Sequence, residues 1–150
     1  MDGPPDPRAR PRERVLELVA RSGADEVVSW CADLLAGRAA HDDRDLPSLL
    51  WLGGAHAASL LAMDDVEVRV HAYWTRVWAA RGLLHVYSSG AAPRLVDALA
   101  DPAWRVREMA AIHCEVGGRR GGGRARAGRR RRGAAGAGCR RPGTRGGRGG

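Results

Sequence analysis

The sequence predicts an all-α fold, preceded by a disordered segment and followed by an arginine- and glycine-rich tail. Between residues 12 and 116, apolar side chains recur mostly at intervals of three and four residues, which is the spacing along one face of a helix. One run, residues 64–70, alternates as a strand would. It has no second strand-like run to pair with, so we interpret it as a connection or the start of a helix.

Seven helices are expected, each from its apolar spacing and from the residues at its ends. They cover residues 12–22, 24–36, 48–54, 55–63, 73–87, 92–100 and 102–116. In the first helix, Val15, Leu18 and Val19 form the apolar stripe, and Gly23 follows as a C-terminal stop. Residues 1–11 are rich in proline, which fixes φ and lacks an amide hydrogen, and they predict an extended or disordered start.

The middle helices are strongly apolar. Residues 24–36 place Val27, Cys31 and Leu34 on one broad face. After a polar loop, the stretch 48–54 closes with two glycines, and 55–63 follows directly.

The later helices differ in character. Residues 73–87 have apolar side chains on overlapping faces, which predicts a helix largely surrounded by protein. In 92–100 the apolar stripe is formed by Leu95, Val96 and Leu99. The last helix begins after Asp101, whose carboxylate suits an N-cap, and with Pro102, whose missing amide hydrogen costs nothing in the first turn.

The sequence shows a weak internal repeat. AASLL at 57–61 matches APRLV at 92–96, and Trp74 occupies the position in the first unit that Trp104 occupies in the second. Asp101-Pro102, then Val106-Arg107, then Ala110-Ala111 resembles the HEAT repeat. The resemblance implies a short right-handed α-solenoid of antiparallel helix pairs, covering roughly residues 46–116. It also implies a hydrogen-bonded ladder between stacked repeats, formed here by Asp101 and Arg107. In the earlier unit the same spacing joins Asp65 to His71, which departs from the pattern.

Charged residues are distributed unevenly along the chain. Residues 1–118 carry thirteen arginines and seventeen acids, a net charge of −4, whereas residues 119–150 carry twelve arginines and no acid. A basic chain favours nucleic acid or an acidic membrane as partner, and that inference applies only to the tail. Residues 117–150 also lack Leu, Ile, Val, Met and aromatic side chains, so we expect them to be disordered.

Two explanations of the tail remain open. RGG triplets at 120–122, 145–147 and 148–150 are typical of segments that bind nucleic acid through phosphates, although no aromatic residue is interleaved to stack on bases. Alternatively, the tail is a repeat gene read out of frame, because suitable codons for 126–128, shifted by one nucleotide, encode Ala-Leu-Ala. We favour the frame shift, since the composition changes just inside a repeat.

The resemblance implies a protein-binding scaffold without catalytic activity, built on the second helix of each pair. The candidate partner-binding residues are Trp74, Trp78, Arg81, Trp104, Arg105 and Glu108, with Arg69 and Arg76 as further surface candidates. Because no further repeat follows, the face from Val106 to His113 is expected to lie bare, which predicts marginal stability or self-association.

Spacing indicates no catalytic residues, no cofactor and no metal site, since the five histidines and three cysteines are scattered. One alternative is a HEAT-like DNA glycosylase, in which Trp74, Trp78 and an acid such as Asp64 would hold the damaged nucleotide. The net negative charge of residues 1–118 disfavours it. No signal peptide or membrane span is recognised, so a soluble, cytoplasmic protein that does not contact a membrane is expected.

Overall fold

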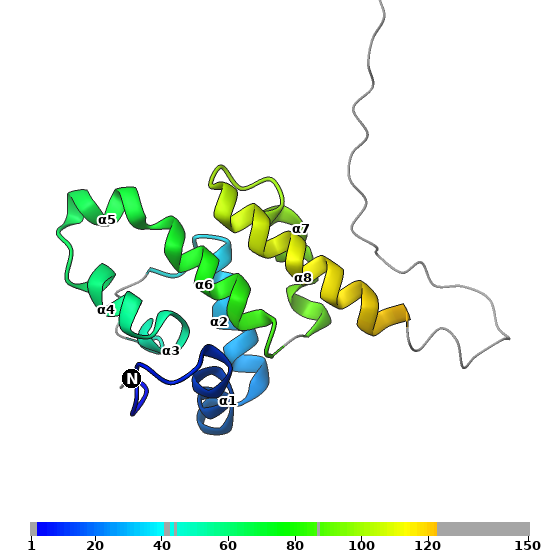
Figure 1. The fold of residues 1–150 in the computed structure, drawn as a ribbon, viewed down its shortest axis with the longest axis horizontal. Coiled ribbons are helices and arrows are strands. Elements are labelled where there is room, and N and C mark those ends of the chain that lie inside the picture. Colours follow the sequence, from blue (N-terminus) through cyan, green and yellow to red (C-terminus); the bar gives the residue numbers. More distant parts are fainter. Residues whose placement is uncertain (1–2, 41–42, 44, 87, 123–150) are drawn as a thin grey trace, which may run out of the picture.

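The computed structural model describes residues 3–40, 43, 45–86 and 88–122, and this part of the chain contains helices and no strand (Figure 1). The all-α prediction is therefore confirmed. The elements are α1 (Pro11–Ser22), α2 (Ala24–Leu35), α3 (Leu50–Gly53), α4 (Ala55–Leu61), α5 (Asp65–His71), α6 (Tyr73–Leu83), the 3-10 turn η1 (Ser89–Ala91), α7 (Ala92–Ala98) and α8 (Trp104–Gly122).

The alternating run at 64–70 forms helix α5. Its N-cap is Asp64, whose carboxylate accepts hydrogen bonds from the main-chain N–H groups of Val66 and Glu67, both at 2.9 Å. These bonds satisfy two of the amides that a helix leaves free in its first turn. The local capping chemistry thus outweighs the strand-like alternation.

The segment before α1 is packed against the helices. Arg14 is only 4% exposed. Its guanidinium donates to the main-chain oxygens of Pro7, Trp51 and Leu52 at 3.3 Å each, and also to that of Ala9. Burial lowers the pKa of Arg14, and the charge of Asp6 opposes this shift. The carbonyl groups of Pro7 and Ala9 thus supply acceptors that a buried guanidinium requires, while the disorder expected for residues 1–11 stays a prediction.

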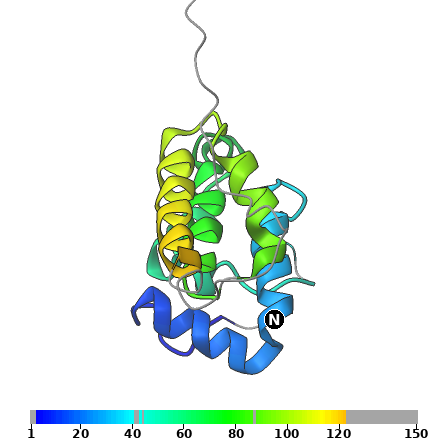
Figure 2. The ribbon, with the colours of Figure 1, turned by 90° about the vertical axis from the view of Figure 1, so that its right-hand side faces the viewer.

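One hydrophobic core joins the helices. Helix α2 contacts α1, α6 and α7, and α6 also contacts α8. Figure 2 shows α6 and α8 side by side, with α1 lying across one end of the bundle. Cys31 of α2 is fully buried in this core, and burial raises the pKa of its thiol to about 12. Cys31 therefore stays a neutral thiol at physiological pH.

Helices α6 and α8 run in the same direction. Near their starts, the guanidinium of Arg105 lies over the ring of Trp74. Further along both helices, the Nε2 atom of His113 hydrogen-bonds with the main-chain oxygen of Leu83 at 3.1 Å. Helix α7 packs against both α8 and α2.

The repeat pattern implies that the helix at 55–63 packs as an antiparallel pair with the helix at 73–87. In the structure these two helices have other main neighbours. Helix α4 makes its main contacts with α3 and α5, whereas the main neighbours of α6 are α2, α8 and α3. The main packing partner of α6 is therefore α2, and not α4 as the repeat pattern implies. Between α4 and α6 lies a pocket, described below.

Two expectations for the last helix need correction. The face from Val106 to His113 is not bare: Val106 and Ala110 are fully buried, and His113 is 4% exposed. Helix α8 also continues to Gly122, past Val116, where the apolar pattern ends. A formed helix gains one hydrogen bond for each added residue, so it can extend beyond the residues that anchor it.

Each helix in the described ranges is too short or too polar to cross a bilayer.

Candidate functional site: an aromatic and arginine surface beside a pocket

Four of the predicted partner-binding residues form one chain of contacts. The rings of Trp74 and Trp78 stack with centroids 6.0 Å apart and planes at 25°. These residues are four positions apart on α6, so they lie on the same side of that helix. The guanidinium carbon of Arg105 lies 5.3 Å from the ring centroid of Trp74 and 4.4 Å from that of Trp104. Arg105 thus bridges α6 and α8 by cation–π contacts.

These side chains differ greatly in accessibility. Trp78 is 5% exposed and packs in the core, so its main role is structural. Trp104 is 55% exposed, which is unusual for a large aromatic side chain. Arg105 and Glu108 are also exposed. A partner could therefore reach Trp104, Arg105 and Glu108 directly.

Ile112 extends this exposed surface and was missed in the sequence analysis. It is 41% exposed and follows Trp104 and Glu108 at successive four-residue intervals along α8. Residues at this spacing lie along one side of a helix. We refer to Trp104, Glu108 and Ile112 as the α8 stripe. The spacing is visible in the sequence, but only burial of Val106 and Ala110 shows which face points outward.

Arg81 lies away from the α8 stripe and lines a pocket of about 520 Å³ between α4, α5 and α6. The wall on α6 is formed by Trp74, Trp78 and Arg81. The remaining lining residues are His56, Ser59, Leu60, Met63 and His71. Trp74, Trp78 and Arg81 had been selected from the sequence as candidate partner-binding residues, whereas the residues of α4 become candidates only when the helices are placed in space.

Among the described residues, no acidic side chain pairs with the charge of Arg81. Its Nη2 atom donates to the main-chain oxygen of Leu52 at 3.2 Å, and none of the ion pairs among the described residues includes Arg81. Burial lowers the pKa of Arg81, and the nearby charge of Arg14 lowers it further. The pocket therefore contains a partly buried cation without a counter-ion, an arrangement that favours an anion.

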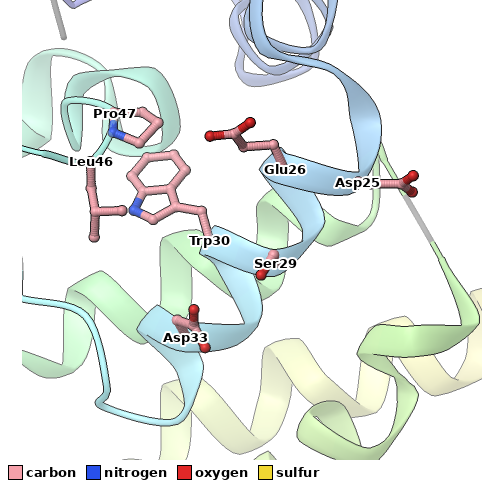
Figure 3. A pocket seen from close by; sticks show the side chains of 7 residues that line it. All are labelled: Asp25, Glu26, Ser29, Trp30, Asp33, Leu46 and Pro47. Carbon is pink, nitrogen blue, oxygen red and sulfur yellow. The ribbon is translucent and has the colours of Figure 1, made fainter.

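A second pocket, of about 450 Å³, lies beside α2 and is acidic (Figure 3). It is lined by Asp25, Glu26, Ser29, Trp30, Asp33, Leu46 and Pro47. Trp30 is 4% exposed, its Nε1 atom has no hydrogen-bond partner among the residues with a described position, and in Figure 3 this nitrogen points toward Leu46. Asp33 is already paired with Arg38. None of these residues could be selected from the sequence, because isolated acids on a helix carry no distinctive spacing.

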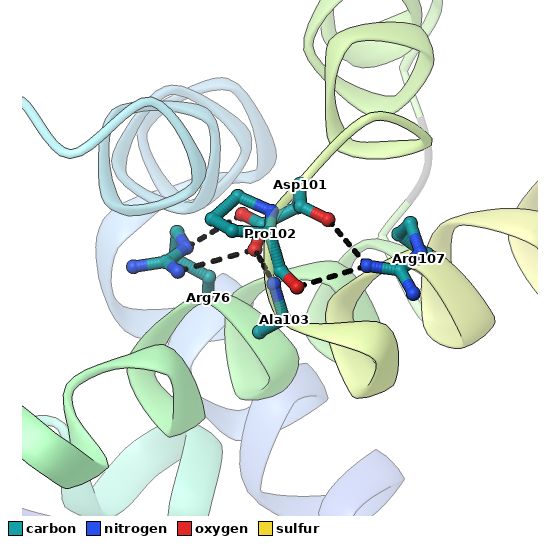
Figure 4. Close-up of polar contacts among 5 residues, drawn as sticks. All are labelled: Arg76, Asp101, Pro102, Ala103 and Arg107. Atoms are coloured by element: carbon teal, nitrogen blue, oxygen red, sulfur yellow. Dashed lines mark hydrogen bonds and ion pairs between the residues drawn. The ribbon is translucent and has the colours of Figure 1, made fainter.

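The ladder implied by the HEAT resemblance has a different form here (Figure 4). Arg107 donates to the main-chain oxygens of Asp101 and Pro102, at 2.8 and 2.9 Å, and not to the Asp101 carboxylate. That carboxylate instead accepts two hydrogen bonds from Arg76 of α6, at 2.8 and 3.2 Å, and one from the N–H of Ala103 at 2.8 Å. Arg76, expected at the surface, therefore ties α6 to the start of α8.

The other sequence-based candidates are placed as follows. Arg69 donates to the main-chain oxygen of Asp65 within α5. Asp64, the acid considered for a glycosylase, caps α5 and does not line the pocket beside Trp74 and Trp78. Over the residues with a described position, no three His, Cys, Asp or Glu side chains come together as a metal site would require. The tail from 123 to 150, with its RGG triplets, lies outside the described residues.

The chain matches none of the protein-family models, curated proteins or solved structures with which it was compared. Its function must therefore be inferred from its own side chains, chiefly from the α8 stripe, Arg105 and the pocket that contains Arg81.

Proposed function

We propose that the protein is a short HEAT-like α-solenoid that acts as a protein-binding scaffold without catalytic activity. The observation that carries this proposal is the exposed side chain of Trp104, with Arg105 lying over its ring. Tryptophan and arginine are enriched among the few residues that contribute most to binding energy at protein interfaces. A rigid, exposed tryptophan offers a large contact area at a small cost in conformational entropy.

The arrangement of the helices supports the solenoid part of the proposal. Helices α6 and α8 lie side by side in the same direction, as the second helices of successive repeats do. The ion pair between Arg76 and Asp101 links them through the turn before α8. Such contacts between neighbouring units set the register of a stack of helix pairs.

The α8 stripe specifies the chemistry of the partner surface. Trp104 and Ile112 would contact apolar side chains, while Glu108 between them would contact a cation. Arg105, at the edge of the stripe, would contact a carboxylate. The best match is a partner face with apolar side chains about two helical turns apart and with both signs of charge at its rim.

Affinity capture from an extract of the source organism, with the full chain as bait, tests this proposal. We expect at least one protein to be retained by the wild type but reduced at least about tenfold by Trp104→Ala, because truncation of a hot-spot tryptophan has effects of that size. Leu16→Ala is the matched control, since Leu16 is also an exposed apolar residue, 39% exposed, but lies on α1. Titration of the purified partner then measures the direct affinity.

The proposal fails if every retained protein binds the Trp104→Ala and Leu16→Ala baits equally. Circular dichroism of both variants should match the wild type, because neither side chain is buried.

A further inference from the structure

We propose that the pocket between α4, α5 and α6 binds a small aromatic carboxylate, with Arg81 as the anchor for the carboxylate group. This site is separate from the α8 stripe and goes beyond the scaffold function. The observations behind it are the form of the pocket, its apolar and aromatic walls, and the uncompensated charge of Arg81.

The pocket has the size and composition of a small-molecule site. Its volume of about 520 Å³ falls within the range of roughly 300–1,000 Å³ that such sites occupy. The stacked rings of Trp74 and Trp78 form one wall, and Leu60 and Met63 also line the space. Aromatic rings and a methionine sulfur both make favourable contacts with the ring of a ligand. An aromatic group would therefore bind better than a polar one.

Arg81 provides the polar anchor. One of its nitrogens is held by the main-chain oxygen of Leu52, which orients the guanidinium, and other N–H groups stay free for a ligand. A planar guanidinium can bind a carboxylate through two parallel hydrogen bonds. No acid in the described ranges competes for Arg81, and Arg14 adds to the positive potential. A bound carboxylate would offset the cost of this partly buried charge.

The polar residues lie at the accessible part of the pocket. His56 and Ser59 of α4 are exposed, and His71 is half-buried at the end of α5. Substitution of Ser59 by a larger residue would therefore fill the opening without disturbing the core.

Isothermal titration of the full chain with 2-naphthoate tests the proposal, with 2-naphthylmethanol as the neutral analogue of the same shape. We expect 2-naphthoate to bind with a Kd of about 1 mM or lower, as ligands of this size do in a well-formed pocket. The alcohol should bind at least about tenfold more weakly, because it cannot form the charge-assisted pair with Arg81. Ser59→Trp should abolish binding of both compounds.

Two further variants separate the role of Arg81 from a general loss of structure. Arg81→Met should bind the alcohol as the wild type does, but should lose the preference for 2-naphthoate. Arg94→Met, which removes an exposed guanidinium on α7, should keep that preference. Trp104→Ala should bind 2-naphthoate normally, so this site and the scaffold function can fail independently. Equal affinity of the wild type for the two compounds, unchanged binding by Ser59→Trp, or no binding at millimolar concentrations would overturn the proposal.

Discussion

At the scale of single residues, arginine side chains occur in three different environments in this protein. Arg14 is buried and satisfied by main-chain oxygens, Arg76 is paired with Asp101, and Arg81 has a single main-chain acceptor. The guanidinium has five N–H donors in one plane, so a single side chain can bind several acceptors from different segments. Lysine, which is absent from this chain, offers no such planar fork.

The ion pair between Arg76 and Asp101 should contribute to stability. Its side chains are only 26% and 10% exposed, and the contact is bidentate. A double-mutant cycle with Arg76→Ala and Asp101→Ala should give a coupling energy of about 1–3 kcal/mol in urea unfolding. The exposed pair of Arg94 and Asp97 is the control, and its coupling should be about 0.5 kcal/mol or less, because solvent screens it. Similar coupling energies for both pairs would contradict this assignment.

At the scale of elements, the contact of α3 with α6 depends on a glycine. A Cβ atom at Gly53 would lie 2.7 Å from a ring carbon of Trp78 and 2.7 Å from the Cβ atom of Ala57. Neither neighbour can move easily, since both are buried in the core. The close approach of these elements therefore requires that residue 53 has no side chain.

Gly53→Ala should lower the free energy of unfolding by about 1–3 kcal/mol, the usual cost of overpacking a core. In the control, Gly90→Ala, the new Cβ atom would lie no closer than 3.6 Å to its nearest neighbour, the hydroxyl oxygen of Ser88. That variant should stay within about 0.5 kcal/mol of the wild type. Urea unfolding followed by tryptophan fluorescence measures both, and an unaltered midpoint for Gly53→Ala would exclude the close packing described here.

Element positions were largely predictable, and the differences have local causes. Helix spans followed from apolar spacing, because burial of one face repeats with the period of the helix. Residues 64–70 alternate, yet the cap at Asp64 makes them helical. The turns of α8 beyond Val116 carry no apolar signal, so no pattern predicted them. Capping bonds and helix extension are formed by main-chain groups, and the spacing of apolar side chains does not predict them.

At the scale of the whole molecule, α5 stands apart from the single core. It has no buried residue, Val66 and Val70 are 66% and 67% exposed, and in Figure 1 it lies at the edge of the fold. We expect its amides to exchange with deuterium much faster than those of α2 and α6, because local opening of α5 exposes little apolar surface. Hydrogen-exchange mass spectrometry of the full chain measures this difference. Equal protection of the three helices would show that α5 opens only with the whole domain.

The candidate site could be predicted from the sequence only in part. Trp74, Trp78 and Arg81 could be selected from the sequence because their spacing places them on one face of the helix expected at 73–87. In the structure, Trp74 and Trp78 form one chain of contacts with Arg105 and Trp104. These residues differ in accessibility, since Trp78 is buried and Trp104 is exposed. The opposite wall of the pocket, on α4, and the lack of a counter-ion for Arg81 depend on distances between segments far apart in the chain.

The sequence by itself determined the helical class, most helix spans and the separation of charge between residues 1–118 and the tail. These properties are local, since a helix repeats every few residues and charges can be counted along the chain. Tertiary structure alone decided that α2, and not α4, packs against α6, that Asp101 binds Arg76, and that Arg81 faces a pocket. Such choices arise from competition among helix faces for the same core, and the outcome depends on long-range packing that no local pattern contains.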